Sequence, residues 1–139
     1  MLSVQRHVLE SNASVSKIRA LIKAELIKAG VRPSGAFDCL VAVTEACSKV
    51  LRHKQDSAVD EPPRIGWEIS SEGASFYVDD FSGRDWEMEV PTIDLDNSLT
   101  KLGVEGFGVT ALRKLMDDVS FEKTEDETQT VVVLSKSFR

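Results

Sequence analysis

The sequence lacks an apolar run long enough to cross a membrane. A membrane-spanning helix needs roughly 20 consecutive apolar residues, and no stretch of this chain approaches that length. The amino terminus also lacks the basic start and unbroken apolar run of a secretory leader. We therefore expect neither export nor membrane binding, and a cytoplasmic location.

Cysteine is scarce as well, because the chain has only Cys39 and Cys47. Both fall in one predicted helix, about 12 Å apart at ~1.5 Å per residue, which is beyond the reach of a disulfide. We interpret them as small core residues of a protein in a reducing compartment.

Positive charge is in deficit, since 17 Lys and Arg residues face 23 Asp and Glu residues and leave a net charge of −6. A field of this sign repels the phosphate backbone of DNA or RNA, so we expect no direct nucleic-acid partner. A smaller polyanion such as ATP is still compatible, because backbone N–H groups or a helix N-terminus can compensate its charge locally.

The 139 residues, 42% of them hydrophobic, predict a single domain over 1–139 with a real core. Apolar residues recur every three or four positions in some segments, which predicts helices, and alternate in others, which predicts strands. The stretch 81–104 has neither period, and long loops of this kind are usually functional, so we interpret it as a lid. The predicted helices cover about 14–29, 33–53 and 106–116, and the predicted strands cover 4–9, 64–70, 74–79, 119–122 and 130–136.

The second predicted helix carries two stripes of residues at helical spacing. The stripe predicted to be buried consists of Phe37, Leu40, Val41, Thr44, Cys47, Ser48 and Leu51. Beside it, Glu45, Lys49 and His53 follow one another at i,i+4 steps and share one side of the helix. Trp67 and Trp86 are assigned to packing, as anchors of the core and of the lid.

A glycine turn, Gly106-Phe107-Gly108, comes directly before the third predicted helix. The N–H groups at a helix start are unpaired and attract anions, so the turn is a candidate phosphate site. The alternative is a tight turn that lets the backbone pack closely. The turn by itself does not separate these two interpretations.

Several motifs follow one another in an order that is typical of one family. They are Val43-Thr44-Glu45-Ala46 with His53, then 78–83, then 106–109 with 115–119, and finally 130–136. Together they cover nearly the whole chain and resemble the RsbW/SpoIIAB anti-sigma serine kinases of the GHKL group of ATPases. The resemblance implies an α+β fold, a two-layer α/β sandwich of the Bergerat type. Its mixed, mostly antiparallel sheet would be covered on one face by three helices, with ATP held beneath the lid.

The resemblance also implies roles for particular residues. Asp80, at a strand end, would accept a hydrogen bond from the adenine amino group, and Thr130 would contact the base. Gly83 and the turn Gly106-Phe107-Gly108 would let the backbone approach the phosphates of ATP or ADP. Glu45 would be the general base that activates a serine hydroxyl of a protein substrate. The alternatives are that Asp80 is an exposed loop acid and Thr130 an ordinary strand residue.

The chain departs from the family at the metal site. One turn after the catalytic glutamate the family carries an asparagine that binds Mg²⁺, where this chain has Lys49. An ammonium group has no lone pair for a cation, so we assign no metal ligand and expect the usual Mg²⁺ site to be broken. Two interpretations of Lys49 stay open: it contacts the phosphates directly, as a nucleotide-binding residue, or it pairs with Glu45.

Two further departures reduce the expected phosphate contacts. Ser82 replaces a glycine of the family motif Asp-x-Gly-x-Gly, and Val104 stands where some members carry a basic residue. Lys101 or Arg84 could substitute for that residue if the lid closes. Phosphoryl transfer relies on metal and charge placement, so we expect kinase activity to be weak or lost.

These observations predict an anti-sigma-factor-like regulator of a bacterial partner-switching system. It would bind a sigma factor or an anti-anti-sigma antagonist of the STAS type and, by family analogy, form a homodimer. The alternative is an active serine/threonine kinase in which Asp79 or Asp85 supplies a replacement metal ligand. A third interpretation keeps the fold as an interaction module that binds no nucleotide.

Overall fold

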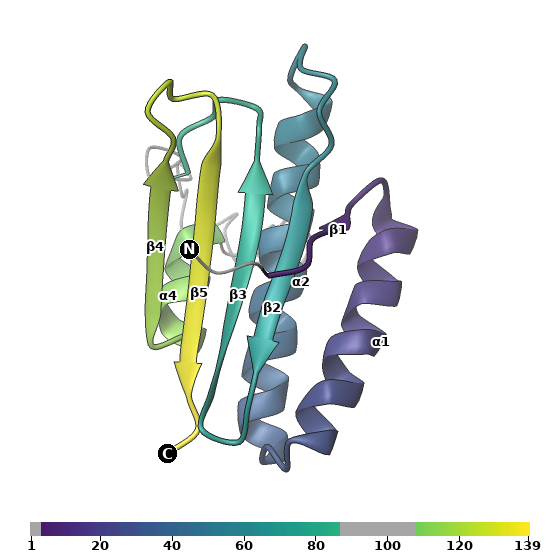
Figure 1. The fold of residues 1–139 in the computed structure, drawn as a ribbon, viewed down its shortest axis with the longest axis vertical. Helices are drawn as coiled ribbons and strands as arrows, with labels where there is room; N and C mark the ends of the chain where they lie inside the picture. Colours follow the sequence, from purple (N-terminus) through teal and green to yellow (C-terminus); the bar gives the residue numbers. More distant parts are fainter. Residues whose placement is uncertain (1–3, 87–107) are drawn as a thin grey trace, which may run out of the picture.

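The computed structural model describes residues 4–86 and 108–139, which form three helices and five strands (Figure 1). The helices are α1 (Asn12–Lys28), α2 (Pro33–Gln55) and α4 (Gly108–Leu115). The strands are β1 (His7–Val8), β2 (Arg64–Ile69), β3 (Gly73–Asp80), β4 (Asp118–Lys123) and β5 (Thr130–Ser137). None of these described helices is long and apolar enough to cross a membrane.

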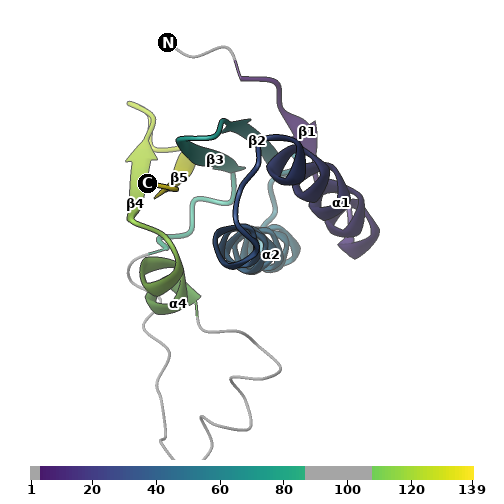
Figure 2. The same cartoon turned by 90° about the horizontal axis from the view of Figure 1, so that it is seen from below.

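The strands form one sheet in the order β1-β2-β3-β5-β4. All three helices lie on the same side of this sheet (Figure 2), so the two-layer α+β sandwich predicted from the sequence is confirmed. Every pairing between the described strands is antiparallel, where the prediction allowed for a mixed sheet. The predicted strand 4–9 is reduced to the two residues of β1, and α2 runs two residues past its predicted end.

Helix α1 buries apolar residues that recur at steps of three and four along its sequence. The buried residues are Val15, Ile18, Ile22 and Leu26. The helix stops at Gly30, as predicted, through a Schellman motif in which Gly30 N–H donates to Ile27 O at 3.0 Å and Val31 N–H to Leu26 O at 3.1 Å. This motif requires a left-handed residue, and the φ of Gly30 is +78°.

The buried face of α2 differs from the prediction. Phe37, predicted to be buried, is 64% exposed, and of the predicted stripe Cys47 alone is fully buried. The face that packs inward is lined by Cys39, Ala42, Val43, Ala46, Cys47 and Val50. Alanine weighs little in a hydrophobic pattern, but its small side chain lets a helix approach its neighbours closely. Helix α2 needs this, because it contacts α1, α4 and β3.

The two cysteines of α2, Cys39 and Cys47, are buried free thiols. Burial raises the pKa of Cys39 to about 11 and the pKa of Cys47 to about 12. Both thiols therefore stay protonated at neutral pH and are poor nucleophiles. The predicted role in core packing is confirmed.

Residues 4–6, which precede β1, cross the face of the sheet that the helices do not cover (Figure 2). They pass over Gly66 of β2, where an added Cβ would lie 2.5 Å from the Gln5 carbonyl oxygen and 2.8 Å from Val4 Cγ1. Real Cβ atoms do not approach other atoms so closely, so this crossing requires glycine. Beyond it, the His7 ring of β1 stacks on Trp67 with 4.8 Å between ring centroids.

Two isoleucines of α1 provide a matched test of the packing. Ile22 is fully buried, whereas Ile27 is 65% exposed. We expect Ile22→Ala to lower the free energy of unfolding by about 2–5 kcal/mol, because it leaves a cavity in the core. Ile27→Ala should change it by less than about 0.5 kcal/mol. Urea unfolding monitored by circular dichroism measures both, and equal losses would contradict the assigned burial.

Candidate functional site

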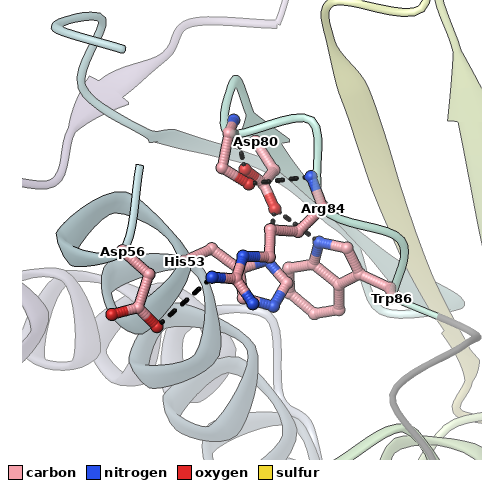
Figure 3. A network of polar contacts seen from close by, with 6 residues as sticks. His53, Asp56, Asp80, Arg84 and Trp86 are labelled. Carbon is pink, nitrogen blue, oxygen red and sulfur yellow. Dashed lines mark hydrogen bonds and ion pairs between the residues drawn. The ribbon is translucent and has the colours of Figure 1, made fainter. Parts of the chain in front are cut away.

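The carboxylate of Asp80 lies at the end of β3, only 2% exposed, at the centre of a polar network (Figure 3). Its Oδ2 atom accepts a hydrogen bond from the Trp86 indole Nε1 at 2.6 Å and lies 2.7 Å from His53 Nδ1. Its Oδ1 atom accepts the backbone N–H of Ser82 at 2.8 Å. The alternative interpretation of Asp80 as an exposed loop acid is therefore wrong.

This network sets the charge of Asp80. Burial by itself raises the pKa of a carboxyl group, but hydrogen bonds from His53, Ser82 and Trp86 together outweigh it and hold the pKa of Asp80 below its ordinary value of 3.8. Asp80 is therefore ionised at neutral pH. Because an ionised carboxylate only accepts hydrogen bonds, the Nδ1 atom of His53 carries the proton of their shared bond.

Trp86 is the largest fully buried side chain among the described residues, at 1% exposed. Its ring meets His53 edge-on at 5.3 Å and lies tilted against Phe121 of β4 at 6.1 Å between centroids. An indole of this kind buries roughly 200 Å², which stabilises by at most about 5 kcal/mol at ~25 cal/mol per Å². The predicted packing role of Trp86 is confirmed, whereas its bond to Asp80 was not predicted.

Two ion pairs connect the same segment to its neighbours. Arg84 lies 3.7 Å from Asp56, just after α2, and Asp85 lies 3.9 Å from Lys123 of β4. All four side chains are at least 44% exposed, and exposed pairs contribute about 0–1 kcal/mol each. The segment 81–86 is therefore held mainly by Trp86.

Lys49 of α2 is buried, at 4% exposed, in an unusual place for a lysine. Its Nζ atom lies 5.7 Å from the centroid of the Trp86 ring, within cation–π range. The same atom lies 3.9 Å from where a Cβ on Gly108 would stand. Gly108 begins α4 with a φ of +64°, so Lys49 lies between Trp86 and the helix start that the sequence assigns to phosphates.

Glu45, one turn before Lys49, has a side chain that is 15% exposed. Its Oε2 atom accepts the backbone N–H of Gly108 at 3.4 Å and lies 3.9 Å from Arg52 Nη2. Burial raises the pKa of Glu45 above its ordinary 4.5, although Gly108, Arg52 and Lys49 oppose the shift. The folded state thus holds this proton more tightly than the unfolded chain, so Glu45 contributes stability as the pH falls through its folded pKa.

The remaining predicted residues divide into two groups. Thr130 is buried and lies directly opposite Asp80 in the β3–β5 pairing. Gly83 lies three residues after Asp80 in the chain, and its φ of +78° favours glycine. Gly106, Phe107, Lys101 and Val104 lie outside the described residues, as does the predicted lid from residue 87 onward. The structure thus brings Glu45, Lys49 and Gly108 together, beside the neighbouring pair of Asp80 and Thr130.

Asp79 lies on the other face of the sheet from Asp80, because successive strand residues point to opposite faces. Its carboxylate pairs with Arg6 at 3.0 Å and with Arg64 at 3.4 Å. It therefore cannot replace the missing metal ligand near Lys49, which corrects one possibility left open by the sequence. Within residues 4–86 and 108–139, no group of three or more His, Cys, Asp or Glu side chains is arranged to hold a metal ion.

An open depression lies at the opposite end of the sheet, where the β2–β3 hairpin meets the end of β5. Two ion pairs lie at it: Arg139 with Glu72 at 2.6 Å, and Lys136 with Asp38 at 3.2 Å. Such satisfied surface charges give it no reactive group. The buried charges around Asp80 and Lys49 are the better candidate site.

We expect Asp80→Asn to destabilise the protein by about 1–3 kcal/mol at pH 7, because an amide leaves a buried donor of the network unsatisfied. The pKa of Asp80 is lower in the folded state than in the unfolded chain. The stabilisation that Asp80 contributes is therefore complete above pH 3.8, the ordinary pKa, and is lost as the pH falls through the pKa of the folded state. The gap between variant and wild type should therefore narrow below about pH 4. Urea unfolding at several pH values measures it, with the exposed Asp60→Asn as control. Equal midpoints at pH 7 would contradict the network.

Comparison with known protein families agrees with the geometry of the site. A family model described as the histidine kinase-like ATPase domain matches residues 9–136. Among curated proteins no match is found. The matched range spans nearly the whole chain and contains Glu45, Lys49, Asp80 and Thr130. The chain therefore belongs to the family of histidine kinase-like ATPase domains, of the GHKL type.

Proposed function

We propose that this domain acts as an anti-sigma-factor-like regulator in a bacterial partner-switching system. It would bind a sigma factor, an anti-anti-sigma antagonist of the STAS type, or both, in the cytoplasm, and its serine kinase activity would be weak or lost. The observation that carries the proposal is the buried ammonium of Lys49 beside Glu45 and Gly108. Membership of the histidine kinase-like ATPase family supports the ATPase fold that the proposal requires.

The residues around Lys49 do not fit the Mg²⁺ that the family uses. Lys49 stands where the resemblance places the metal-binding amide, and its ammonium offers three donors but no acceptor. Magnesium requires near-octahedral oxygen ligands, and a fixed positive charge at this position repels it. Since phosphoryl transfer depends on cations placed around the transferred group, loss of the metal argues for a role in binding rather than in catalysis.

A working kinase is the second candidate, and Glu45 is the residue that favours it. Its carboxylate lies at the start of α4, 3.4 Å from Gly108 N, and burial raises its pKa. A carboxylate with a raised pKa is a stronger general base near neutral pH. In this version, Mg²⁺ would still bind, with Asp85 as the replacement metal ligand.

The homodimer remains a prediction, because it follows from family analogy alone. A regulator of this kind needs a surface for its partner, and its partner is a protein rather than a nucleic acid, given the net charge of −6. Size-exclusion chromatography with light scattering distinguishes a monomer from a dimer.

The metal dependence of ATP binding separates the two candidates. We expect the wild type to bind ATP with nearly the same affinity with and without Mg²⁺, because Lys49 repels the ion. Lys49→Asn supplies an amide oxygen and should make Mg²⁺ strengthen ATP binding by about tenfold, or about 1.4 kcal/mol. Isothermal titration calorimetry measures both, with the exposed Lys23→Asn of α1 as control. Tight, Mg²⁺-dependent binding by the wild type would overturn the proposal.

Glu45→Gln tests the kinase directly. If the wild type transfers phosphate to a serine of a STAS antagonist, the variant should lose that activity by at least about 100-fold, because general-base catalysis contributes that much. Binding of ATP should be unchanged, and folding should be unaffected or slightly stabilised, because a buried carboxylate is replaced by a neutral amide. Incorporation of ³²P into the antagonist measures the transfer. Rapid phosphorylation by the wild type that Glu45→Gln abolishes would favour the kinase over the regulator.

A further inference from the structure

Trp86 donates its indole N–H to the carboxylate that the family resemblance assigns to the adenine amino group. In that resemblance, the Asp80 carboxylate accepts an N–H of the adenine amino group, and here it accepts the indole N–H at 2.6 Å. An indole and an adenine are both planar, fused two-ring systems that donate an N–H in the ring plane. We propose that Trp86 is an internal occupant of the base site and that an adenine nucleotide binds only after the indole has left.

The hydrogen-bonding capacity of Asp80 supports direct competition. Its Oδ2 atom already contacts two donors, Trp86 at 2.6 Å and His53 at 2.7 Å. A carboxylate oxygen offers two lone pairs, so an adenine amino group that bonds to Oδ2 needs one of these donors to withdraw. His53 belongs to the long helix α2, whereas Trp86 follows β3 outside any helix or strand. Trp86 is therefore the group that leaves.

The packing around the Trp86 ring also indicates that adenine and the indole compete for one space. The indole is 1% exposed and is enclosed by His53 of α2 at 5.3 Å, Phe121 of β4 at 6.1 Å and the Lys49 ammonium at 5.7 Å. A second flat ring cannot stack in so filled a space. Figure 3 shows Trp86 beside Asp80 and His53, with the indole nitrogen bonded directly to the carboxylate.

Displacement of Trp86 also changes the surroundings of Lys49. The indole covers the ammonium on one side, and Gly108 at the start of α4 lies on another. When the ring leaves, the side of the ammonium that it covered opens next to a helix N-terminus, and both attract phosphate. The same movement thus opens the base site and presents a cation to the phosphates. This inference rests on the nucleotide site of the proposed function, but not on its protein partner.

Trp86→Ala should strengthen ADP binding by at least about tenfold, because a site that is more than nine-tenths self-occupied weakens the apparent affinity by that factor. Trp86→Phe, which keeps a ring but loses the N–H, should give a smaller gain. Trp67→Phe, the other tryptophan, should leave the affinity unchanged. Isothermal titration with metal-free ADP measures all three, and circular dichroism establishes that each variant is folded.

Fluorescence gives a second readout that needs no change at Trp86. In the Trp67→Phe background Trp86 is the sole tryptophan, and ADP should shift its emission to longer wavelength and increase its quenching by acrylamide. Binding of ADP without these changes would overturn the inference. If Trp86→Ala does not fold, the fluorescence measurement decides the question instead. A folded Trp86→Ala that binds ADP no tighter than the wild type, or not at all at millimolar ADP, would also overturn it.

The two proposals fail in different experiments. The displacement of Trp86 is measured with ADP alone, without Mg²⁺ and without a protein substrate. Efficient phosphorylation of an antagonist would defeat the regulator while leaving the displacement intact. Conversely, an unchanged Trp86 signal on ADP binding would defeat the displacement and leave the role in partner switching untouched.

Discussion

The buried charge of Asp80 is the interaction on which the rest of the site depends. Three groups contact its carboxylate: the imidazole of His53, the indole of Trp86 and the backbone N–H of Ser82. Removing a carboxylate from water is costly unless donors replace the water, so each donor is required. Through them, Asp80 fixes α2, the end of β3 and the segment 81–86 relative to one another.

Seen together, Trp86 and Lys49 reproduce the main parts of a nucleotide–metal complex. The indole supplies a flat ring with an N–H directed at Asp80, and the ammonium supplies a positive charge near the start of α4. The chain thus carries covalently what a related ATPase takes from solution. The Lys49 ammonium lies 5.7 Å from the centroid of the Trp86 ring. A cation gains stability from the face of an aromatic ring, so each of these two side chains favours the position of the other.

Sequence patterns predicted the fold better than they predicted the site. The stripe of α1 and its stop at Gly30 follow from local rules, because period and φ are properties of neighbouring residues. The inward face of α2 was mispredicted, since Ala42 and Ala46 are buried by the helices on either side rather than by their own hydrophobicity. Asp80 and Trp86 lie outside any periodic sequence pattern, so only the three-dimensional structure reveals the hydrogen bond between them.

A filled base site has a consequence for the abundance of the protein. An ATPase with an empty pocket exposes apolar walls to water and is stabilised when its ligand binds. Here the core is already complete with the chain's own indole, which is 1% exposed. The folded domain therefore does not need nucleotide to complete its core, and bound nucleotide adds less to its stability than it adds to an ATPase with an empty site. When nucleotide is scarce, a cell would therefore lose less of this protein than of an ATPase with an empty pocket.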